Sequence, residues 1–333
     1  MSIKPDVETI DAYRARFHDR EHWVPFVRRA AEQLGLPCDT VEETLPGSYP
    51  TFRVGEKIYK FFGELFGGVE SFAVERQVYG VLAQAPDLPV PRLLGEGMLF
   101  PDDADWRWPY LVMTRVPGFS LGEGRSDLAL DERLDLAREM GQLVRLFHTL
   151  PIKVSGPLRP EWGPFLNFMR EQRANLAEQH AAWGLLTPTM MRDLEAYVPC
   201  AEELVDVSRA PCLLHGDLTA DHWLGEWASP YRLNGVIDMG DARVGDPFYE
   251  LVALHLWAFD CDKGMLRAFC QSYGLLEAEQ PGFARKVMSY ALLHAFDVLV
   301  GVMARSDVRE MSLEELGRRL WDLDEPGLEG GTA

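Results

Sequence analysis

The stretch that decides the fold reads Leu214-His215-Gly216-Asp217-Leu218-Thr219-Ala220-Asp221-His222-Trp223-Leu224, and Gly235-Val236-Ile237-Asp238 follows it. Short apolar runs alternate with polar turns here, so we expect strands joined by loops over residues 211–238. These loops gather Asp217, His222 and Asp238 beside strands that would otherwise be core. Aspartate also favours solvated turns. We interpret the group as a chemical site, because three polar side chains recur so close to apolar strands.

Phosphoryl transfer requires such a set of side chains. One carboxylate orients the attacking hydroxyl, and others hold magnesium, which neutralises charge on the transferring phosphate. A cation is also needed on the nucleotide phosphates. Lys60 alternates with apolar residues in Lys57-Ile58-Tyr59-Lys60-Phe61-Phe62 and could point inward from a strand. Glu75, fifteen residues later on a predicted helix, is its expected ion-pair partner.

Working outward, the N-terminal part predicts a helix and then strands. Apolar residues from Trp23 to Leu34 recur at helical spacing, and Gly35 ends the pattern. A second helix is expected to contain residues 70–82. The expected strands cover residues 40–45, 51–54, 57–62 and 108–116. This part therefore predicts a β-rich lobe with two helices.

Beyond residue 116 the character changes, and almost everything except residues 211–238 has helical spacing. The clearest expected helices cover residues 136–148, 171–179 and 284–303. Ser312-Leu313-Glu314-Glu315 has the capping-box pattern ahead of a last helix. The sequence therefore predicts an α+β protein of two lobes, a β-rich nucleotide-binding N-terminal lobe (1–116) and a mostly helical C-terminal lobe (117–333).

Composition indicates a globular cytoplasmic protein. Hydrophobic residues make up 47% and charged residues 26%, which is ordinary for a globular chain. No segment approaches the roughly 18 apolar residues of a membrane span, and Met1-Ser2-Ile3-Lys4-Pro5-Asp6 lacks the apolar stretch of a signal peptide. The five cysteines form no close-spaced pair, so we expect reduced thiols.

The formal net charge of −19 argues against nucleic acid or an anionic membrane as a partner, since both require a basic surface. This charge suits a cationic small molecule as the ligand, although an acidic surface more often serves solubility. We expect a monomer.

His215-Gly216-Asp217 followed by Ile237-Asp238 resembles the aminoglycoside phosphotransferase family of protein-kinase-like small-molecule kinases. Within it the chain looks most similar to the hygromycin B 7″-O-kinase type, and the likeness spans nearly the whole chain. The further matching segments are residues 25–36, Lys60-Phe61-Phe62-Gly63-Glu64, residues 89–95, residues 108–113 and Trp183-Gly184. The resemblance implies a two-lobed kinase fold and transfer of a nucleotide γ-phosphate to an alcohol.

The resemblance also implies roles for individual residues. Asp217 is the expected catalytic carboxylate and Asp238 the metal-binding aspartate, and Lys60 with Glu75 forms the expected nucleotide-orienting pair. Gly47-Ser48-Tyr49 stands where a phosphate-covering turn belongs. The segment Met113-Thr114-Arg115-Val116 is the expected hinge, whose backbone meets the adenine or guanine of ATP or GTP.

One residue departs from the family pattern. Most such kinases place an asparagine five residues after the catalytic aspartate as the second metal ligand, and this chain has His222. Magnesium prefers oxygen ligands, whereas imidazole suits softer divalent ions. Macrolide kinases in the wider family also place histidine there. His222 is therefore expected to bind the metal or, alternatively, to be a satisfied loop histidine.

Two other classes of function remain open at this point. Cys212, His215, Asp217, His222 and Asp238 could be ligands of a metal-dependent hydrolase, but their spacing matches no closed zinc pattern. A nucleotide-binding pseudokinase is conceivable because of His222. Against it, Asp217, Asp238, Lys60 and Glu75 together fill the main roles of phosphoryl transfer.

The acceptor is the least determined part of the hypothesis. An aminocyclitol antibiotic is a polycation and requires carboxylates in its pocket. The candidates that follow the catalytic segment are Asp241, Glu250, Asp260, Asp262 and Asp297. Asp260 and Asp262 rank first because they follow the catalytic loop. Asp297 is of interest because it falls in a mostly apolar predicted helix. A macrolide or a metabolite is the alternative acceptor.

Overall fold

The computed structural model describes residues 15–17, 19–43, 47–63, 67–103, 106–124, 128–153, 156–228, 231–275, 278 and 280–328. Some sequence expectations therefore fall on residues outside the described ranges. These residues are the N-terminal segment Met1–Asp6, the end of the expected strand at 44–45, Glu64 of the matching segment, and 229–230 of the expected strands and loops over 211–238.

The chain divides by its contacts into two compact units. The first runs to Pro117 and also includes Val236–Asp241, and the second comprises Gly118–Gly235 and Ala242 onward. The expected boundary lay one residue earlier. The short segment Val236–Asp241 was expected in the second lobe, but it makes its contacts with the first.

The first unit contains a sheet whose neighbouring strands are all antiparallel, in the order β1-β2-β3-β5-β4. The strands are β1 (Glu42–Glu43), β2 (Thr51–Val54), β3 (Lys57–Phe61), β4 (Leu93–Met98) and β5 (Pro109–Thr114). β3 lies at the centre of the sheet, and its Lys60 is paired in register with Thr51 of β2 and Leu111 of β5. A side chain at this position has little freedom to move along the sheet.

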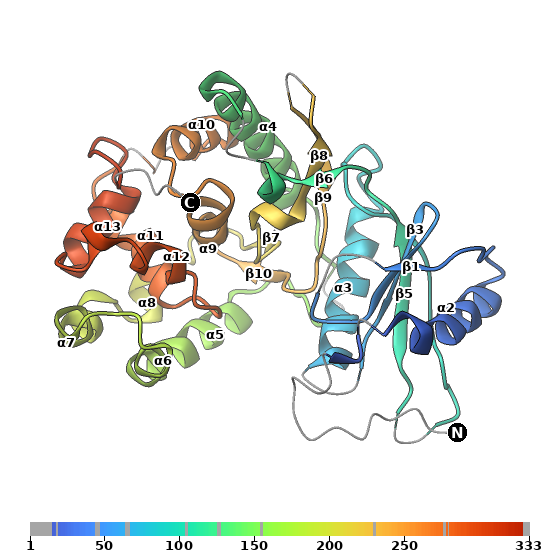
Figure 1. The fold of residues 1–333 in the computed structure, drawn as a ribbon. Helices are drawn as coiled ribbons and strands as arrows, with labels where there is room; N and C mark the ends of the chain where they lie inside the picture. Colours follow the sequence, from blue (N-terminus) through green and yellow to red (C-terminus); the bar gives the residue numbers. More distant parts are fainter. Residues whose placement is uncertain are drawn as a thin grey trace. The chain divides into compact units, whose positions relative to one another are not determined.

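Two helices, α2 (Arg20–Leu34) and α3 (Gly68–Leu82), lie on opposite sides of these strands (Figure 1). Both were expected, and α2 ends where its left-handed Gly35 donates its N–H to the helix carbonyls. Successive strand residues face opposite sides. Tyr59 and Phe61 join the aromatic core that includes Trp23 of α2, so Lys60 faces the other side, where α3 presents Glu75.

The second unit is mostly helical, as expected. Its helices are α4 (Leu130–His148), α5 (Trp162–Ala174), α6 (Leu176–Trp183), α7 (Pro188–Tyr197), α8 (Ala201–Leu204), α9 (Pro247–Ala253), α10 (Lys263–Tyr273), α11 (Phe283–Leu292), α12 (Val300–Met303) and α13 (Leu313–Trp321). α4 and α10 pack so closely that a side chain at Gly141 of α4 would collide with the Phe269 carbonyl of α10. The predicted cap of α13 is present, since Ser312 accepts from the N–H of Glu315.

Short strands and turns carry the decisive segment of sequence. The strands are β6 (Phe119–Ser120), β7 (Cys212–Leu214), β8 (Trp223–Glu226), β9 (Arg232–Val236) and β10 (Arg243–Gly245). The single-turn elements are η1 (Leu121–Glu123), η3 (Ala220–His222), the π-helical η4 (Leu254–Ala258) and η6 (Ser306–Val308). β7 pairs with β10, and β8 lies between β6 and β9. The loop between β7 and β8 contains both Asp217 and His222.

The helix expected over residues 284–303 is wrong as a single element. α11 ends at Leu292 and α12 begins at Val300, so Asp297 lies in a turn between them. The break follows from tertiary contacts that helical spacing does not reveal. The buried His294 ring stacks on Tyr249 at 4.6 Å, and the Tyr249 hydroxyl accepts from the N–H of Ala295.

Among the described residues, no helix combines the length and apolar character needed to cross a bilayer.

The aromatic contacts of α2 predict that replacing Trp23 strongly destabilises the first unit. Trp23 packs its ring 5.0 Å from Trp108, 5.3 Å from Phe61 and 5.9 Å from Phe52. Replacing Trp23 by Ala leaves a cavity, so we expect a loss of about 3–5 kcal/mol of unfolding free energy. Hydrogen exchange of the peptides that cover β2 and β3 measures this loss within the first unit.

Phe26→Ala is the matched control, because Phe26 lies one turn later on α2 and is only partly buried. It should cost clearly less than Trp23→Ala. An equal loss in both variants would contradict this account of the core.

Candidate active site

Lys60 is the centre of a buried ion-pair group in the first unit. Its Nζ lies 3.0 Å from Oε2 of Glu75 and 2.9 Å from Oδ1 of Asp238. Lys60 is 7% exposed and Glu75 is 1% exposed. The predicted pair of Lys60 with Glu75 is thus present, and the structure adds Asp238 to it.

The surroundings of this group hold Lys60 in its charged form. Burial disfavours the charge, but the carboxylates of Asp238 and Glu75 outweigh burial and raise the pKa of Lys60 above its usual range. The hydroxyl of Tyr79, one turn beyond Glu75 on α3, lies 3.3 Å from Oε1 of Glu75. The aromatic rings of Tyr49 and Phe62 lie 5.6 and 5.4 Å from the ammonium. Lys60 is therefore a fixed cation on the face of the sheet.

Asp238 follows β9 in an unusual backbone conformation. Its φ is 66°, in the left-handed region that few residues other than glycine adopt. Its Oδ1 accepts from the N–H of Gly240 at 3.3 Å as well as from Lys60. The side chain remains 38% exposed, so the carboxylate can also meet a ligand from solution. Strain of this kind is often retained where it positions a functional group.

The expected nucleotide contacts also lie in the first unit. Gly47 and Ser48 are exposed, and the ring of Tyr49 packs 5.0 Å from Phe62, beside Lys60. Met113 and Thr114 end β5, and Val116 follows it. The N–H of Thr114 donates to the carbonyl of Arg92 at 2.8 Å, so this part of the expected hinge is anchored to the start of β4.

Asp217 and His222 lie together in the second unit, in the loop between β7 and β8. Nδ1 of His222 lies 2.6 Å from the backbone carbonyl of Asp217 and 3.6 Å from its Oδ2. A carbonyl only accepts, so Nδ1 carries the proton and Nε2 has the lone pair in the neutral ring. A backbone carbonyl commonly orients a metal-binding imidazole in this way. The geometry therefore fits a ligand role for Nε2.

A buried glutamate that was considered only as an acceptor ligand anchors the start of this loop. Glu250 of α9 is 2% exposed. Its Oε2 accepts from the N–H of His215 at 2.6 Å, and its Oε1 accepts from the N–H of Gly216 at 2.9 Å. Both donors immediately precede Asp217. Glu250 is therefore a positioning residue for the loop, and burial excludes it as an acceptor ligand. One sequence feature could have revealed this buried role: Glu250 is the single acid within the apolar run Phe248-Tyr249-Glu250-Leu251-Val252.

Glu250 is paired with His148 of α4, another residue that the sequence did not single out. Nε2 of His148 lies 3.2 Å from Oε2 of Glu250, and its Nδ1 lies 2.8 Å from the hydroxyl of Tyr273. Burial opposes charge on both groups. Hydrogen bonds from His148 and the backbone nevertheless lower the pKa of Glu250, and Cys212 and Glu250 raise the pKa of His148 well above its usual value.

The three expected acceptor carboxylates occupy different environments in the second unit. Asp262 caps α10 with Oδ1 and pairs Oδ2 with Arg133 at 3.1 Å, so both of its oxygens are engaged. Asp260 is exposed, has a left-handed φ of 51° and lies 3.4 Å from Arg305. Asp297 lies in the turn before α12, where burial raises the pKa of its carboxyl. Asp246 caps α9, where its side chain accepts from the N–H of Phe248.

The donor atoms fit a metal that is held largely by its substrate. Asp238 offers a carboxylate and His222 an imidazole nitrogen. Within the described residues, no three His, Cys, Asp or Glu side chains are grouped so that they could hold a metal ion. Magnesium often binds through one or two protein side chains plus substrate phosphates. The described residues therefore offer no metal site built by the protein alone.

A model of the phosphotransferase enzyme family matches residues 57–286. The chain is also 22% identical to the curated Arabidopsis thaliana protein "Lysine-specific demethylase JMJ21", over 91% of this chain. It spans about half (45%) of the length of that relative.

Two solved structures show the same fold. The GDP complex of wild-type aminoglycoside 2'-phosphotransferase-IIIa superposes with a TM-score of 0.63 at 20% identity, over 90% of this chain and 97% of that one. Aminoglycoside phosphotransferase APH(3'')-Id from Streptomyces rimosus superposes with a TM-score of 0.56 at 19% identity, over 84% and 98%. The expected α+β, kinase-like fold is confirmed.

The ion pair of His148 with Glu250 predicts a pH dependence of stability. The pKa of His148 is higher in the folded chain than its ordinary 6.5, so its contribution is complete below about pH 6.5 and is lost as pH rises through the folded value. We expect the difference in melting temperature between the wild type and His148→Gln to be largest below pH 6.5 and to shrink toward pH 9.

Thermal unfolding at steps of half a pH unit measures this difference. His22→Gln, at an exposed position on α2, is the control and should leave the pH profile of the wild type unchanged. A difference between the wild type and His148→Gln that grows with pH would refute the pairing.

Proposed function

The chain belongs to the phosphotransferase enzyme family, and on that premise we propose that it transfers the γ-phosphate of ATP or GTP to a hydroxyl group of a small molecule. The observation that carries the proposal is the buried Lys60, held between Glu75 and Asp238 at 3.0 and 2.9 Å. Nucleotide phosphates are the ligand that a fixed, charged lysine of this kind suits. The similar structures include a GDP complex, which gives the nucleotide assignment further support.

In the proposed reaction, Asp217 accepts a hydrogen bond from the acceptor hydroxyl and takes its proton as the new bond forms. The hydroxyl oxygen bonds to the γ-phosphorus, the bond from that phosphorus to the β–γ bridging oxygen breaks, and the nucleoside diphosphate leaves. The transition state is loose, so Asp217 acts mainly by orienting the hydroxyl. Glu250 supports this role because it holds the N–H groups of His215 and Gly216.

Charge on the phosphates is balanced by Lys60 and by magnesium. Asp238 and His222 would hold the ion, which when bound supplies positive charge against the transferring phosphate. Gly47, Ser48 and the segment Met113–Val116 are the proposed contacts to the phosphates and the base. Glu75 keeps Lys60 in place. Its carboxylate is only 1% exposed, and among the described ion pairs it is paired with Lys60 alone.

We propose an aminoglycoside or aminocyclitol, with hygromycin B first among them, as the acceptor. The net charge of −19 favours a cation. Asp260 and Asp297 are the better-placed carboxylates, because Asp262 has both oxygens engaged. The exposed rings of Trp257 and Phe296 lie on the same two segments as these acids and offer apolar faces to a sugar. η4, which contains Trp257, also contacts η3 of the catalytic loop.

His222 favours a macrolide or a metabolite as the second candidate acceptor, because it stands where macrolide kinases also have histidine. An acceptor panel separates these possibilities. Nucleotide consumption with magnesium should depend on hygromycin B, and a kanamycin-type aminoglycoside, a macrolide, choline and homoserine complete the panel. Nucleotide binding without turnover on any acceptor would favour a pseudokinase.

Asp217→Ala should lower turnover at least about 100-fold, because the acceptor hydroxyl loses its orienting base. Nucleotide affinity, measured by calorimetry, should change only a few-fold, since Asp217 is not among the proposed nucleotide contacts. Asp221→Ala is the matched control from the same loop and should keep most of the activity. Near-normal turnover in Asp217→Ala would show that Asp217 is not the catalytic carboxylate.

His222→Asn should change the metal preference rather than abolish the reaction. An amide oxygen in place of imidazole favours magnesium over softer ions. We therefore expect the ratio of the rate with Mn²⁺ to the rate with Mg²⁺ to fall several-fold in the variant. Equal ratios in the wild type and in His222→Asn would show that His222 does not bind the metal.

A further inference from the structure

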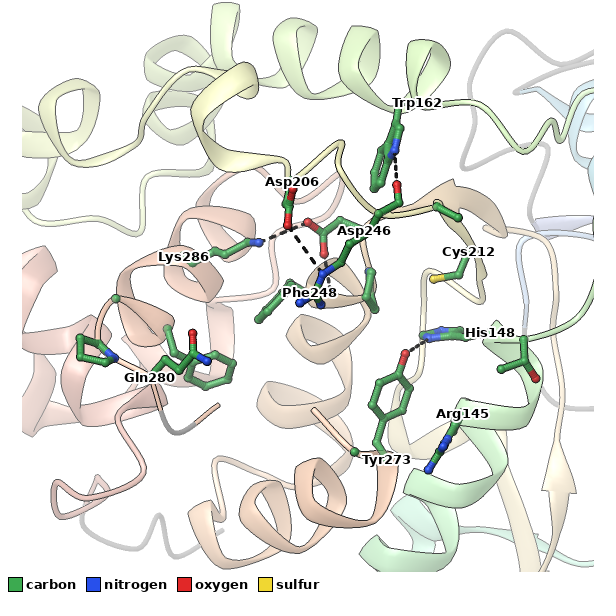
Figure 2. A pocket seen from close by; sticks show the side chains of 18 residues that line it. Arg145, His148, Trp162, Asp206, Cys212, Asp246, Phe248, Tyr273, Gln280 and Lys286 are labelled. Atoms are coloured by element: carbon green, nitrogen blue, oxygen red, sulfur yellow. Dashed lines mark hydrogen bonds and ion pairs between the residues drawn. The ribbon is translucent and has the colours of Figure 1, made fainter. Parts of the chain in front are cut away.

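A cavity of about 540 Å³ lies within the second unit. Its walls come from the end of α4, the start of α9, the end of α10 and the start of α11, and Figure 2 shows their side chains around it. None of the candidate phosphotransfer residues, all of which the structure describes, lines it. The volume falls within the usual range for a small-molecule site, about 300–1,000 Å³. The proposed function leaves this cavity without a role.

Besides His148, three lysine or arginine side chains line the cavity in a chain that is strongly acidic overall. Arg209 pairs with Asp206 at 3.6 Å, and Lys286 pairs with Asp246 at 3.4 Å. The third is Arg145, and no described residue forms an ion pair with it. Its guanidinium lies beside Gly274 at the end of α10, and its position on α4 is exposed. Arg145 therefore presents a full positive charge and its donors to the cavity.

The two acids of the wall are already engaged elsewhere. Asp206 accepts from both the N–H and the hydroxyl of Ser208. Asp246 accepts from the N–H of Phe248 and from the hydroxyl of Tyr290, apart from its pair with Lys286. Both carboxylates therefore already have partners within the protein. The cavity consequently favours a negatively charged occupant over a positive one.

Four aromatic side chains, Trp162, Phe248, Tyr273 and Phe283, also line the cavity. The rings of Phe248 and Phe283 lie 5.9 Å apart, and both side chains are almost fully buried. Lys286 lies 3.9 Å over the Phe248 ring, and Tyr273 stands on the opposite wall beside His148. Aromatic walls favour a flat apolar body. A simple inorganic ion would leave this surface uncovered.

We propose that the cavity is a binding site for a small organic anion with a flat apolar body, whose acidic group pairs with Arg145. The flat body packs against the aromatic part of the wall, where Trp162 and Tyr273 are only partly buried. The carboxylate or similar group takes the charge-assisted hydrogen bonds that the guanidinium offers. The site is separate from the proposed acceptor site, so it does not depend on the identity of the acceptor.

The position of the cavity also gives an occupant a route to the catalytic loop. Its wall residue His148 is bonded to Glu250, which holds the N–H groups of His215 and Gly216 ahead of Asp217. An anion that contacts His148 or Tyr273 would act on this buried group. This coupling rests on the proposed function, whereas binding to the cavity can be measured without it.

Three probes of one shape test the charge preference. 2-Naphthoate is an anion, 2-naphthamide is neutral, and 2-naphthylmethylamine is a cation. Calorimetry on the full chain should show naphthoate binding at least about tenfold more tightly than naphthamide, the size of one charge-assisted hydrogen bond. The amine should bind most weakly. Equal affinities for the three probes, or no binding of naphthoate, would overturn the proposal.

Variants of one residue test the location. Arg145→Gln should weaken naphthoate about tenfold and leave naphthamide unchanged, whereas Arg145→Lys should retain most of the affinity. Arg138→Gln is the matched control, because Arg138 is an exposed arginine seven residues earlier on α4 and does not line the cavity. Naphthoate affinity that is the same in Arg145→Gln and Arg138→Gln would place the probe elsewhere and refute the site. Thermal unfolding of each variant shows whether its fold is retained.

A rate measurement separates this proposal from the proposed function. Saturating naphthoate should change the rate of phosphotransfer by the wild type and leave the rate of Arg145→Gln unchanged. If binding occurs as expected but no acceptor is phosphorylated, the proposed function fails and the cavity site stands. If phosphotransfer is normal and naphthoate does not bind, the cavity site fails alone.

Discussion

The charge of Lys60 is the constraint on which the first unit depends. An ammonium group with 7% exposure costs several kcal/mol to remove from water unless carboxylates compensate it. Glu75 and Asp238 provide that compensation from a helix and from a loop 178 residues away in the sequence. The strand, the helix and the loop must therefore all be in place before the lysine can be buried. The lysine that we propose to meet the nucleotide phosphates is thus also the group that holds this unit together.

The second unit solves a related problem with different residues. The loop between β7 and β8 must hold Asp217, the proposed catalytic carboxylate, in a fixed orientation, yet this part of the loop belongs to no strand. Glu250 takes the place of a neighbouring strand by accepting two backbone N–H groups, and His148 balances the glutamate charge from α4. Each unit thus places a buried charge at its centre and compensates it by contacts between segments that are far apart in sequence.

The sequence was sufficient for features that depend on local pattern. The alternation of Lys60 between Tyr59 and Phe61 predicted an inward lysine on a strand, and the spacing around Glu75 predicted its helix. Features that depend on tertiary contacts were not accessible. Helical spacing continued past Leu292, and only the stacking of His294 on Tyr249 explains the break there. The role of Glu250 depends on the backbone of a distant loop, which no sequence pattern reveals.

The membership of Val236–Asp241 in the first unit has a consequence for how the chain is made. A ribosome completes the sheet, α2 and α3 long before it reaches Asp238, since the whole stretch Gly118–Gly235 comes between them. During that interval Lys60 has only Glu75 as a partner, and the first unit cannot reach its final set of contacts. Domains commonly fold in order as they emerge. In this protein the first unit is begun first and is finished only after much of the second has been synthesised.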